Sequence, residues 1–227
     1  AYNPAGRRTR ITYSSGRIVN YTLDALGRIS GITTRLNASS APQPVVSGVN
    51  YKPFGPVMSF LYGNGLQQTM DYDLDYRVSN IETGTGGNGI HSASYAYDGV
   101  NNITAIIDGI DAASDQAFDY DALNRLSSAT GRYGTLAYTY DGVGNRLTQT
   151  FNTVTGAATE TYALDPASNR LLTVTSTGNQ PRTYTYTATG NVATDKAGFQ
   201  ATFTYNNANR LMQVVNQGVT ADYTYNA

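Results

Sequence analysis

The chain has 227 residues, with 15 Lys and Arg against 16 Asp and Glu, a formal net charge of −1, one His, no Cys and no Trp. The lack of cysteine excludes a disulfide framework, a Cys-based zinc site and a thiol nucleophile, and the balanced charge argues against nucleic acid as a partner. No run of about 18 apolar residues occurs and the first residues do not resemble a signal peptide, so we expect no membrane insertion by this segment and no export signal within it.

The composition favours strands and turns over helices. The chain has 19 Tyr and 23 Gly, and Thr and Asn are abundant, whereas Glu and Lys occur twice each. Tyr and Thr suit a pleated, half-buried surface, Gly and Asn suit turns, and Glu and Lys are among the residues that favour helices. We therefore expect an all-β fold with almost no helix.

In chain order, one landmark residue recurs from the first residues to the last. It precedes an Asp in segments such as YAYDGVNN, FDYDALNR and YTYDGVGNR, and successive landmarks are 19 to 28 residues apart. A period of this length along the whole chain indicates a repeat architecture. The landmarks are Tyr2, Leu23, Tyr51, Tyr72, Tyr97, Tyr120, Tyr140, Leu164, Tyr186, Tyr205 and Tyr225.

The positions around the landmark predict a hairpin. Two residues before it the side chain is aromatic in eight of ten repeats, so both rings share one face of a strand, because strand side chains alternate. One residue after it, an Asp or Asn side chain can accept a hydrogen bond from the backbone two residues on. Four residues after it, Gly or Asn stands in eight of ten repeats and supplies a positive φ. An Arg or Asn and a branched apolar residue then begin the return strand.

We assign a structural role, and no catalytic role, to the residues that carry this motif. The predicted motif residues are Tyr97, Asp98, Asn101, Tyr120, Asp121, Asn124, Arg125, Tyr140, Asp141, Gly144, Asn145, Arg146, Asp165, Asn169, Arg170, Tyr186, Gly190, Tyr205, Asn209 and Arg210. Four positions depart from the pattern: Leu23 and Leu164 replace Tyr, Tyr76 replaces Gly or Asn, and Pro56 replaces Arg or Asn.

Each repeat predicts one β-hairpin with a turn of about four to five residues. A single hairpin is marginal in water, so the hairpins are expected to stack into one long antiparallel sheet that curves or closes. Residues 1–227 then form a single array of about ten repeats. Two irregular segments, 39–44 with two prolines and the glycine-rich 82–92, are expected to lie outside the sheet.

The repeated pattern, seen as YDALNRL, YDGVGNRL and YGNGL, resembles the YD repeat of rearrangement-hotspot (Rhs) proteins. That repeat also occurs in the C component of bacterial insecticidal ABC toxin complexes and in animal teneurins. The resemblance covers residues 2–226 and is specific because it is serial. It implies a β-hairpin sheet that spirals into a hollow shell around a toxin or another C-terminal polypeptide.

Nothing in the chain resembles the self-cleaving region that precedes the toxin in such families. The chain starts in a turn without its preceding strand and stops in mid-turn at YTYNA. We therefore expect a fragment of a longer polypeptide, cut within a repeat at both ends. Its two end strands would be unpaired sheet edges through which the isolated fragment self-associates.

One segment has the ligand spacing of a calcium-binding loop. Asp71, Asp73 and Asp75 alternate, and Glu82 follows Asp71 by eleven residues. Tyr76 occupies the position where such a loop needs Gly, and no flanking helices are predicted. The favoured interpretation is a YD repeat with a solvated acidic strand face, so we expect no metal site and no cofactor.

Two further motifs are weak. Gly84, Gly86 and Gly89 form G-x-G-x-x-G, but the following IHSASYAYD is typical of a strand, whereas a dinucleotide site needs a helix there. His91 is the only histidine, no G-x-S-x-G elbow accompanies it, and we place it in the same exposed loop. The Asp residues recur in step with the hairpins, which a turn role explains and a unique catalytic constellation does not.

The tyrosines support two interpretations. They form a cross-strand ladder that holds neighbouring hairpins together, or they form a recognition surface for glycans or proteins. We favour the ladder. The predicted function is a non-enzymatic wall segment of an Rhs-type shell that encapsulates a toxin, within a secreted or cell-surface bacterial protein; the alternative is an extracellular adhesion or ligand-binding segment. Expected partners are flanking repeats of the same chain, the enclosed cargo and a delivery-system component.

Overall fold

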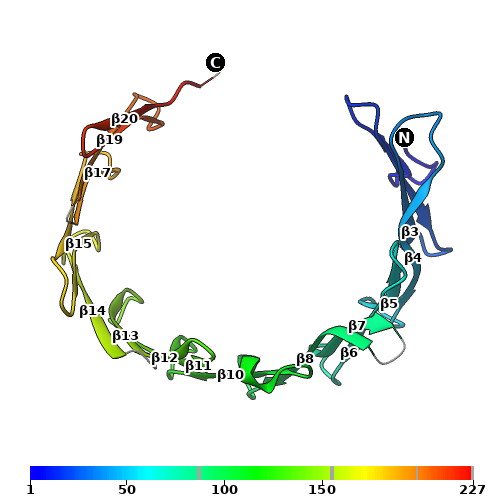
Figure 1. The fold of residues 1–227 in the computed structure, drawn as a ribbon, viewed down its shortest axis with the longest axis horizontal. Coiled ribbons are helices and arrows are strands. Elements are labelled where there is room, and N and C mark those ends of the chain that lie inside the picture. The colour runs from blue at the N-terminus through cyan, green and yellow to red at the C-terminus, as the bar shows by residue number, and fades with distance from the viewer. Residues whose placement is uncertain (86–87, 154–155, 198, 226–227) are drawn as a thin grey trace. The chain divides into compact units, whose positions relative to one another are not determined.

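The computed structural model describes residues 1–85, 88–153, 156–197 and 199–225. These residues form twenty strands of one antiparallel sheet and a single 3-10 turn (Figure 1). The all-β prediction, with almost no helix, is therefore confirmed. Among these residues, no helix has the length and apolar character needed to span a bilayer.

The chain divides into two compact units, and the first comprises residues 1–117. Its consecutive strands pair antiparallel from β1 to β10. The elements are β1 (Arg10–Thr12), β2 (Ile18–Leu23), β3 (Ile29–Arg35), β4 (Gln43–Tyr51), β5 (Val57–Tyr62), β6 (Gln67–Tyr72), β7 (Val78–Thr85), β8 (Asn88–Tyr97), β9 (Ile103–Asp108), the 3-10 turn Ala112–Ser114, and β10 (Gln116–Tyr120), which continues into the second unit.

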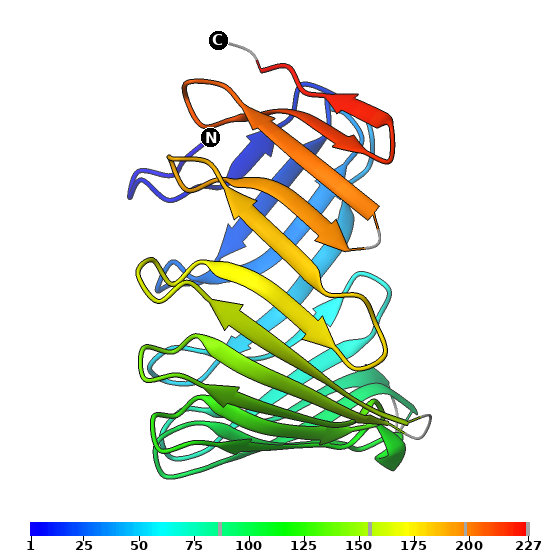
Figure 2. The same ribbon diagram turned by 90° about the vertical axis from the view of Figure 1, so that its left-hand side faces the viewer.

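The second unit comprises residues 118–227 and repeats the same arrangement. Its strands are β11 (Leu126–Gly131), β12 (Gly134–Tyr140), β13 (Arg146–Thr153), β14 (Gly156–Leu164), β15 (Leu171–Ser176), β16 (Arg182–Tyr186), β17 (Val192–Ala197), β18 (Phe199–Tyr205), β19 (Leu211–Asn216) and β20 (Val219–Asp222). Each pairs antiparallel with the next from β11 to β20. The YD turns of this unit lie at one end of the strands, and the connections between hairpins lie at the other end (Figure 2).

A β-bulge recurs at the entrance to the YD turns. Tyr140 pairs with Arg146, but Thr139 pairs with Thr148, so Leu147 is an extra residue in the return strand. The same register shift occurs before seven other turns of the described residues, at 22/23, 50/51, 71/72, 96/97, 163/164, 185/186 and 204/205. Because a bulge interrupts the hydrogen-bond ladder and increases local twist, each repeat carries its own bend beside the turn.

The sheet has almost no hydrophobic core. In the described residues the only buried hydrophobic side chains are Ile18, Ala93, Ala129 and Ala201, and no large side chain is fully buried. Large apolar side chains in the turns, such as Leu74 and Phe54, are almost completely exposed. The sheet is therefore stabilised mainly by hydrogen bonds and side-chain contacts along its own surface, and the two faces are not sealed by a second layer.

Of the two segments expected outside the sheet, the described residues of the glycine-rich segment 82–92 lie inside it. Strand β7 continues to Thr85, β8 begins at Asn88, and His91 pairs with Thr83. Gly86, from the glycine motif, lies outside the described residues. In segment 39–44, residues 39–42 lie outside the strands as expected, and only Gln43 and Pro44 belong to β4. The prediction for 82–92 was wrong because glycine was interpreted as a loop signal, although Gly is tolerated where a paired strand supplies the hydrogen bonds. The expected loop at 39–44 is two residues shorter than predicted because Pro is accepted near the first residue of a strand.

Candidate functional site

The YD turns are the most regular chemical feature of the molecule. In the turn after β10, the Asp121 N–H donates to the Arg125 carbonyl at 2.9 Å, and the Asn124 N–H donates to the Asp121 carbonyl at 2.9 Å. The residue four positions after the landmark has a positive φ in nine of ten turns: the eight with Gly or Asn, as the sequence predicts, and the one with Tyr76, which departs from the pattern. These residues are Gly6, Gly27, Gly55, Tyr76, Asn101, Asn124, Gly144, Gly190 and Asn209. In the tenth turn, which is one residue longer, the positive φ falls on Asn169 instead of Ser168.

In the turns that begin with Asp, the carboxylate organises the backbone. The Asp121 Oδ1 accepts hydrogen bonds from the N–H groups of Leu123 at 2.9 Å and Arg125 at 3.0 Å. Its Oδ2 accepts from the Arg125 Nε at 2.7 Å. The same three contacts recur around Asp24 and Asp73 with Arg28 and Arg77.

These contacts stabilise the charged form of the turn aspartates. Hydrogen bonds from the Arg125 backbone lower the pKa of Asp121, and the hydrogen bond from the Asn145 side chain lowers that of Asp141. The Ala167 backbone N–H lowers the pKa of Asp165 in the same way. Hydrogen bonds to a carboxylate favour its ionised state. The turns therefore carry fixed negative charges that the neighbouring arginines compensate.

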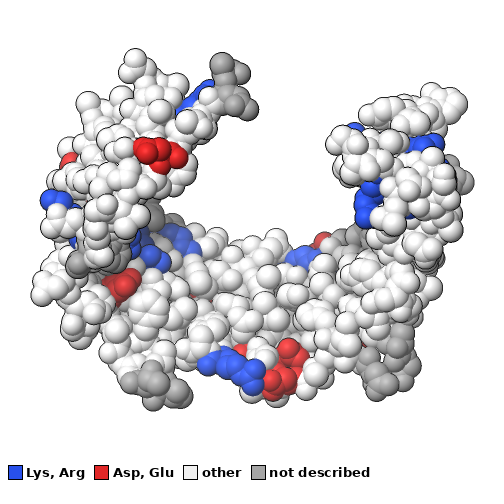
Figure 3. Space-filling view, turned by 45° about the horizontal axis from the view of Figure 1, so that its top comes forward, with Lys and Arg blue, Asp and Glu red and all other residues white. Residues whose placement is uncertain are grey.

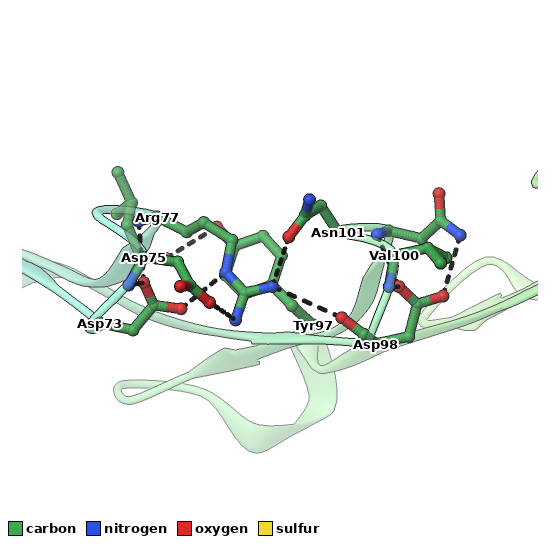
Figure 4. A network of polar contacts seen from close by, with 9 residues as sticks. Asp73, Asp75, Arg77, Tyr97, Asp98, Val100 and Asn101 are labelled. Carbon is green, nitrogen blue, oxygen red and sulfur yellow. Dashed lines mark hydrogen bonds and ion pairs between the residues drawn. The ribbon is translucent and has the colours of Figure 1, made fainter.

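The turn arginines also reach the next repeat. Figure 4 shows Arg77 between Asp73 and Asp75 of its own turn and Asp98 and Asn101 of the next. The Arg77 Nη1 donates to the Asn101 Oδ1 at 2.7 Å. Likewise, the Arg125 Nη1 donates to the Asp141 carbonyl at 2.7 Å. One guanidinium thus joins two consecutive hairpins.

The same guanidinium groups lie over the landmark tyrosine of the following repeat. The Cζ of Arg77 is 4.6 Å from the ring centroid of Tyr97, and that of Arg125 is 4.7 Å from the centroid of Tyr140. The other pairs of this kind are Arg28 with Tyr51, Arg170 with Tyr186 and Arg210 with Tyr225. A cation over an aromatic face contributes about 0.5–1 kcal/mol at exposed sites.

The tyrosine hydroxyl forms a further link between hairpins. The Tyr140 hydroxyl donates to the Leu126 carbonyl at 2.8 Å, and Leu126 begins the return strand of the preceding repeat. In most repeats the acceptor lies beside a bulge, where the ladder is interrupted, so the hydroxyl supplies a donor that the sheet lacks there. The equivalent bonds run from Tyr51, Tyr72, Tyr97, Tyr186 and Tyr225 to the carbonyls of Ile29, Val57, Val78, Leu171 and Leu211.

We name this arrangement of Asp, Arg and Tyr the turn clamp. It specifies how the landmark tyrosines join neighbouring hairpins, which is not through pairs of aromatic rings. The only ring pair within the described residues is Phe60 with Tyr62, at 4.9 Å between centroids. The landmark tyrosines are instead held by arginines and backbone carbonyls. They do join neighbouring hairpins, which is what the ladder interpretation required of them.

In other turns a different residue replaces the Arg or the Asp of the clamp. Asn145 replaces the arginine and donates from Nδ2 to the Asp141 Oδ2 at 2.8 Å and to the Asn169 Oδ1 at 3.3 Å. In the last complete turn, the Asn206 side chain accepts from the Arg210 N–H at 2.9 Å. Tyr120 and Tyr205 end strands β10 and β18.

The repeat in which Leu164 replaces tyrosine is arranged differently. Arg146 lies over Tyr162, two residues before the landmark, with its Cζ 4.4 Å from the ring centroid. The Arg146 Nη2 donates to the Tyr162 hydroxyl at 2.9 Å, and that hydroxyl donates to the Glu160 Oε2 at 2.6 Å. Burial and the bond to Glu160 raise the pKa of Tyr162 to about 12.

The acidic residues considered for calcium are not assembled into a site. Asp73 and Asp75 face Arg77, whereas Asp71 and Glu82 lie in strands, opposite Asn80 and Thr69. Across the described residues, no three or more His, Asp and Glu side chains lie close enough to hold a metal ion. His91 is exposed in β8 and not in a loop.

Charge is scattered over the surface. On the face drawn in Figure 3, Lys, Arg, Asp and Glu form small separate groups, and most of the face is neutral. This distribution differs from the continuous basic surface that nucleic-acid recognition requires.

The hydroxyl link was not predicted, although the sequence contains a signal for it. The landmark is Tyr or Leu and never Phe, whereas the position two residues earlier includes Phe118 and Phe203. A column that excludes Phe while favouring Tyr indicates that the hydroxyl has a partner.

Comparison with known proteins agrees with this geometry. The family described as RHS Repeat matches residues 2–38, and the family described as Teneurin YD-shell matches residues 57–227. No curated protein sequence matches the chain.

Among solved structures, the Tc holotoxin pore of Photorhabdus luminescens is 17% identical, with a TM-score of 0.68 over 95% of this chain. A TcdB2–TccC3 complex is 18% identical, with a TM-score of 0.70 over 94% of this chain. The chain covers 14% and 13% of those two chains, so it corresponds to about one-seventh of their length. At this identity the similarity shows the fold.

Proposed function

The chain belongs to the teneurin YD-shell family, and from this we propose that it is a wall segment of a shell that encloses a polypeptide cargo. The segment is built of shell-type repeats whose fold matches that of the Tc toxin structures. The enclosed polypeptide, by analogy with the hypervariable C-terminal region named for one TcdB2–TccC3 structure, is a toxin or another C-terminal domain.

The turn clamp is the observation that carries this proposal. Where the full set is present, it joins one hairpin to the next through Asp, Arg and Tyr, and it recurs in both units. The sheet meanwhile lacks a buried core. A protein whose stability depends on links between successive hairpins can be extended by adding repeats, and each repeat enlarges the wall without enlarging a core.

The proposed mechanism is steric. A wall of paired strands excludes proteases and the producing cell's own targets from the cargo, and closure of the sheet removes its exposed edges. The partners in this role are flanking repeats of the same polypeptide, the cargo and a component that delivers it. The segment itself carries out no reaction, and the whole protein acts outside the producing cell.

Electron microscopy of the complete natural polypeptide tests the proposal. We expect closed hollow particles with internal density, and limited proteolysis should leave the internal polypeptide intact until the shell is denatured. An open, empty array of repeats would contradict encapsulation and would favour adhesion or ligand binding at the sheet surface.

A further inference from the structure

A pocket lies beside the repeat in which Leu164 replaces tyrosine. Strands β15 and β16 pair through two residue pairs only, Thr173 with Thr183 and Val174 with Arg182, whereas β12 and β13 pair through six. Beside this short pairing lies a pocket of about 450 Å³, within the usual range for small-molecule sites. Strands β14 and β15, which contribute to it, are labelled in Figure 1.

Two ordered polar groups form the sides of the pocket. On one side, Arg146, Tyr162 and Glu160 form the hydrogen-bonded chain described above. On the other, Arg182 forms a two-pronged ion pair with Asp195, with the Nε donating to Oδ1 at 2.7 Å and the Nη2 bonded to Oδ2. Asp195 is only 8% exposed, so this pair holds the arginine in place.

The charges around the pocket cancel. Arg146 and Arg182 contribute two positive charges, and Glu160 and Asp195 contribute two negative charges. The Tyr162 hydroxyl adds no charge, because a tyrosine is protonated at physiological pH. An anionic ligand would therefore meet arginines that already have acidic or aromatic partners, so the pocket favours an uncharged ligand.

The remaining lining suits a ligand with several hydroxyl groups. Ser176, Asn179 and Gln180 line the pocket, and within the described residues no hydrogen bond occupies their side chains. An amide offers both donors and acceptors, which matches the hydroxyl groups along the edge of a sugar ring. Leu171, Val174 and the ring of Tyr184 supply apolar surface for the C–H face of the same ring.

We propose that this pocket binds an uncharged sugar unit of a glycan. The inference is independent of encapsulation, because it concerns the surface of one repeat in the second unit and not the closure of a wall.

Saturation-transfer NMR on the 227-residue chain tests the proposal. The probes are the methyl glycosides of glucose, galactose and mannose and N-acetylglucosamine, with citrate and glucose 6-phosphate as anionic comparisons. We expect transfer to the ring protons of at least one neutral sugar. In the chain itself, the same sugar should shift the backbone amide signals of Ser176 and Gln180.

The variant Asn179→Ala/Gln180→Ala should weaken binding of that sugar about tenfold, because it removes two exposed hydrogen-bonding side chains. The matched control is Gln200→Ala/Asn207→Ala, which removes the same two residue types at exposed positions outside the pocket and should leave binding unchanged. The absence of transfer from every neutral sugar, transfer from the anions alone, or equal binding by both variants would overturn the proposal. None of these results would bear on the shell imaged by microscopy.

Discussion

The turns that begin at Asp121 and Thr187 have the same backbone and different side chains. The Asp121 N–H donates to the Arg125 carbonyl at 2.9 Å, and the Thr187 N–H donates to the Asn191 carbonyl at 2.8 Å. Each turn also has a residue with positive φ four positions after the landmark. The hairpin therefore forms with or without a carboxylate, so Asp is not what determines the backbone of the turn.

The side chains distinguish how firmly each turn is tied to its neighbour. The Asp121 carboxylate accepts three hydrogen bonds from its own turn. The Thr187 hydroxyl makes two, accepting from the Asn191 N–H at 3.1 Å and sharing one with the Thr189 hydroxyl at 2.9 Å. Arg125 then reaches the Asp141 carbonyl and Tyr140, whereas Asn191 reaches the Asn209 Oδ1 at 3.0 Å. The positive-φ residue thus determines the fold of the turn, and the Asp–Arg–Tyr set determines the strength of the link.

The largest effect should come from the feature that both kinds of turn share. Gly144 has φ +99°, and nothing lies within 4 Å of a Cβ added there. Valine at this position is strained by its backbone conformation alone, so Gly144→Val should lower the free energy of unfolding by about 1–3 kcal/mol. Urea denaturation followed by circular dichroism measures this change.

The matched control lies two residues earlier in the same turn. A Cβ at Gly142 also meets nothing within 4 Å, and its φ is outside the left-handed region, so Gly142→Val should cost less than half as much. His91→Ala, at an exposed strand position, should change little. If Gly144→Val and Gly142→Val were equally destabilising, the positive φ would not be the determinant of the turn.

The hydroxyl link should have the next largest effect. Tyr140→Phe removes the hydrogen bond to the Leu126 carbonyl and keeps the ring under Arg125. The expected cost is about 0.5–1.5 kcal/mol, because a half-buried carbonyl loses its donor. Tyr138→Phe is the control, since within the described residues the Tyr138 hydroxyl makes no hydrogen bond. Equal costs in thermal melts would contradict a role for the Tyr140 hydroxyl.

A double-mutant cycle isolates the arginine–tyrosine contact. The single variants Arg125→Gln and Tyr140→Leu and their combination should show a coupling energy of about 0.5–1 kcal/mol, because the guanidinium lies over the ring. The pair Asn191 and Tyr205, around the neutral turn, serves as the comparison and should show a smaller coupling. A larger coupling energy between Asn191 and Tyr205 would contradict the proposal that the Asp121 turn is linked more strongly to its neighbour than the Thr187 turn.

The sequence predicted the local features of the fold and missed the contacts between repeats. Turn position and positive φ follow from residue type over five residues, so they could be inferred from Asp121 and Asn124 alone. The bulge at Leu147 could not, because its register depends on how two strands pair. The hydroxyl links of Tyr97 and Tyr186 end on carbonyls beside bulges of the same kind, so only the absence of Phe from the landmark column indicated them.

In the glycine-rich segment, the sequence predicted a loop where the structure has two paired strands. Gly84 and Gly89 were interpreted as loop residues, yet they pair with each other across β7 and β8. A high glycine content shows only which backbone conformations a segment can adopt on its own. A neighbouring strand can supply the hydrogen bonds that decide its structure, so a short Gly-rich stretch between two strands is ambiguous from sequence.

The smallest expected effect is a difference between the two turns in how much folding stability is lost at low pH. Hydrogen bonds from Arg125 lower the folded-state pKa of Asp121 below its unfolded value of about 3.9. A lowered pKa stabilises the folded state above the unfolded value, and this contribution disappears as the pH falls through the folded value. The urea midpoint should therefore fall on acidification below about pH 4, and it should fall less in Asp121→Asn, which keeps the Oδ1 acceptor without the titrating group.

Thr187→Val, in the turn without a carboxylate, should leave the acid dependence unchanged. If Asp121→Asn lost as much stability in acid as the parent chain, other carboxylates would be responsible and the Asp121–Arg125 pair would act only through its geometry.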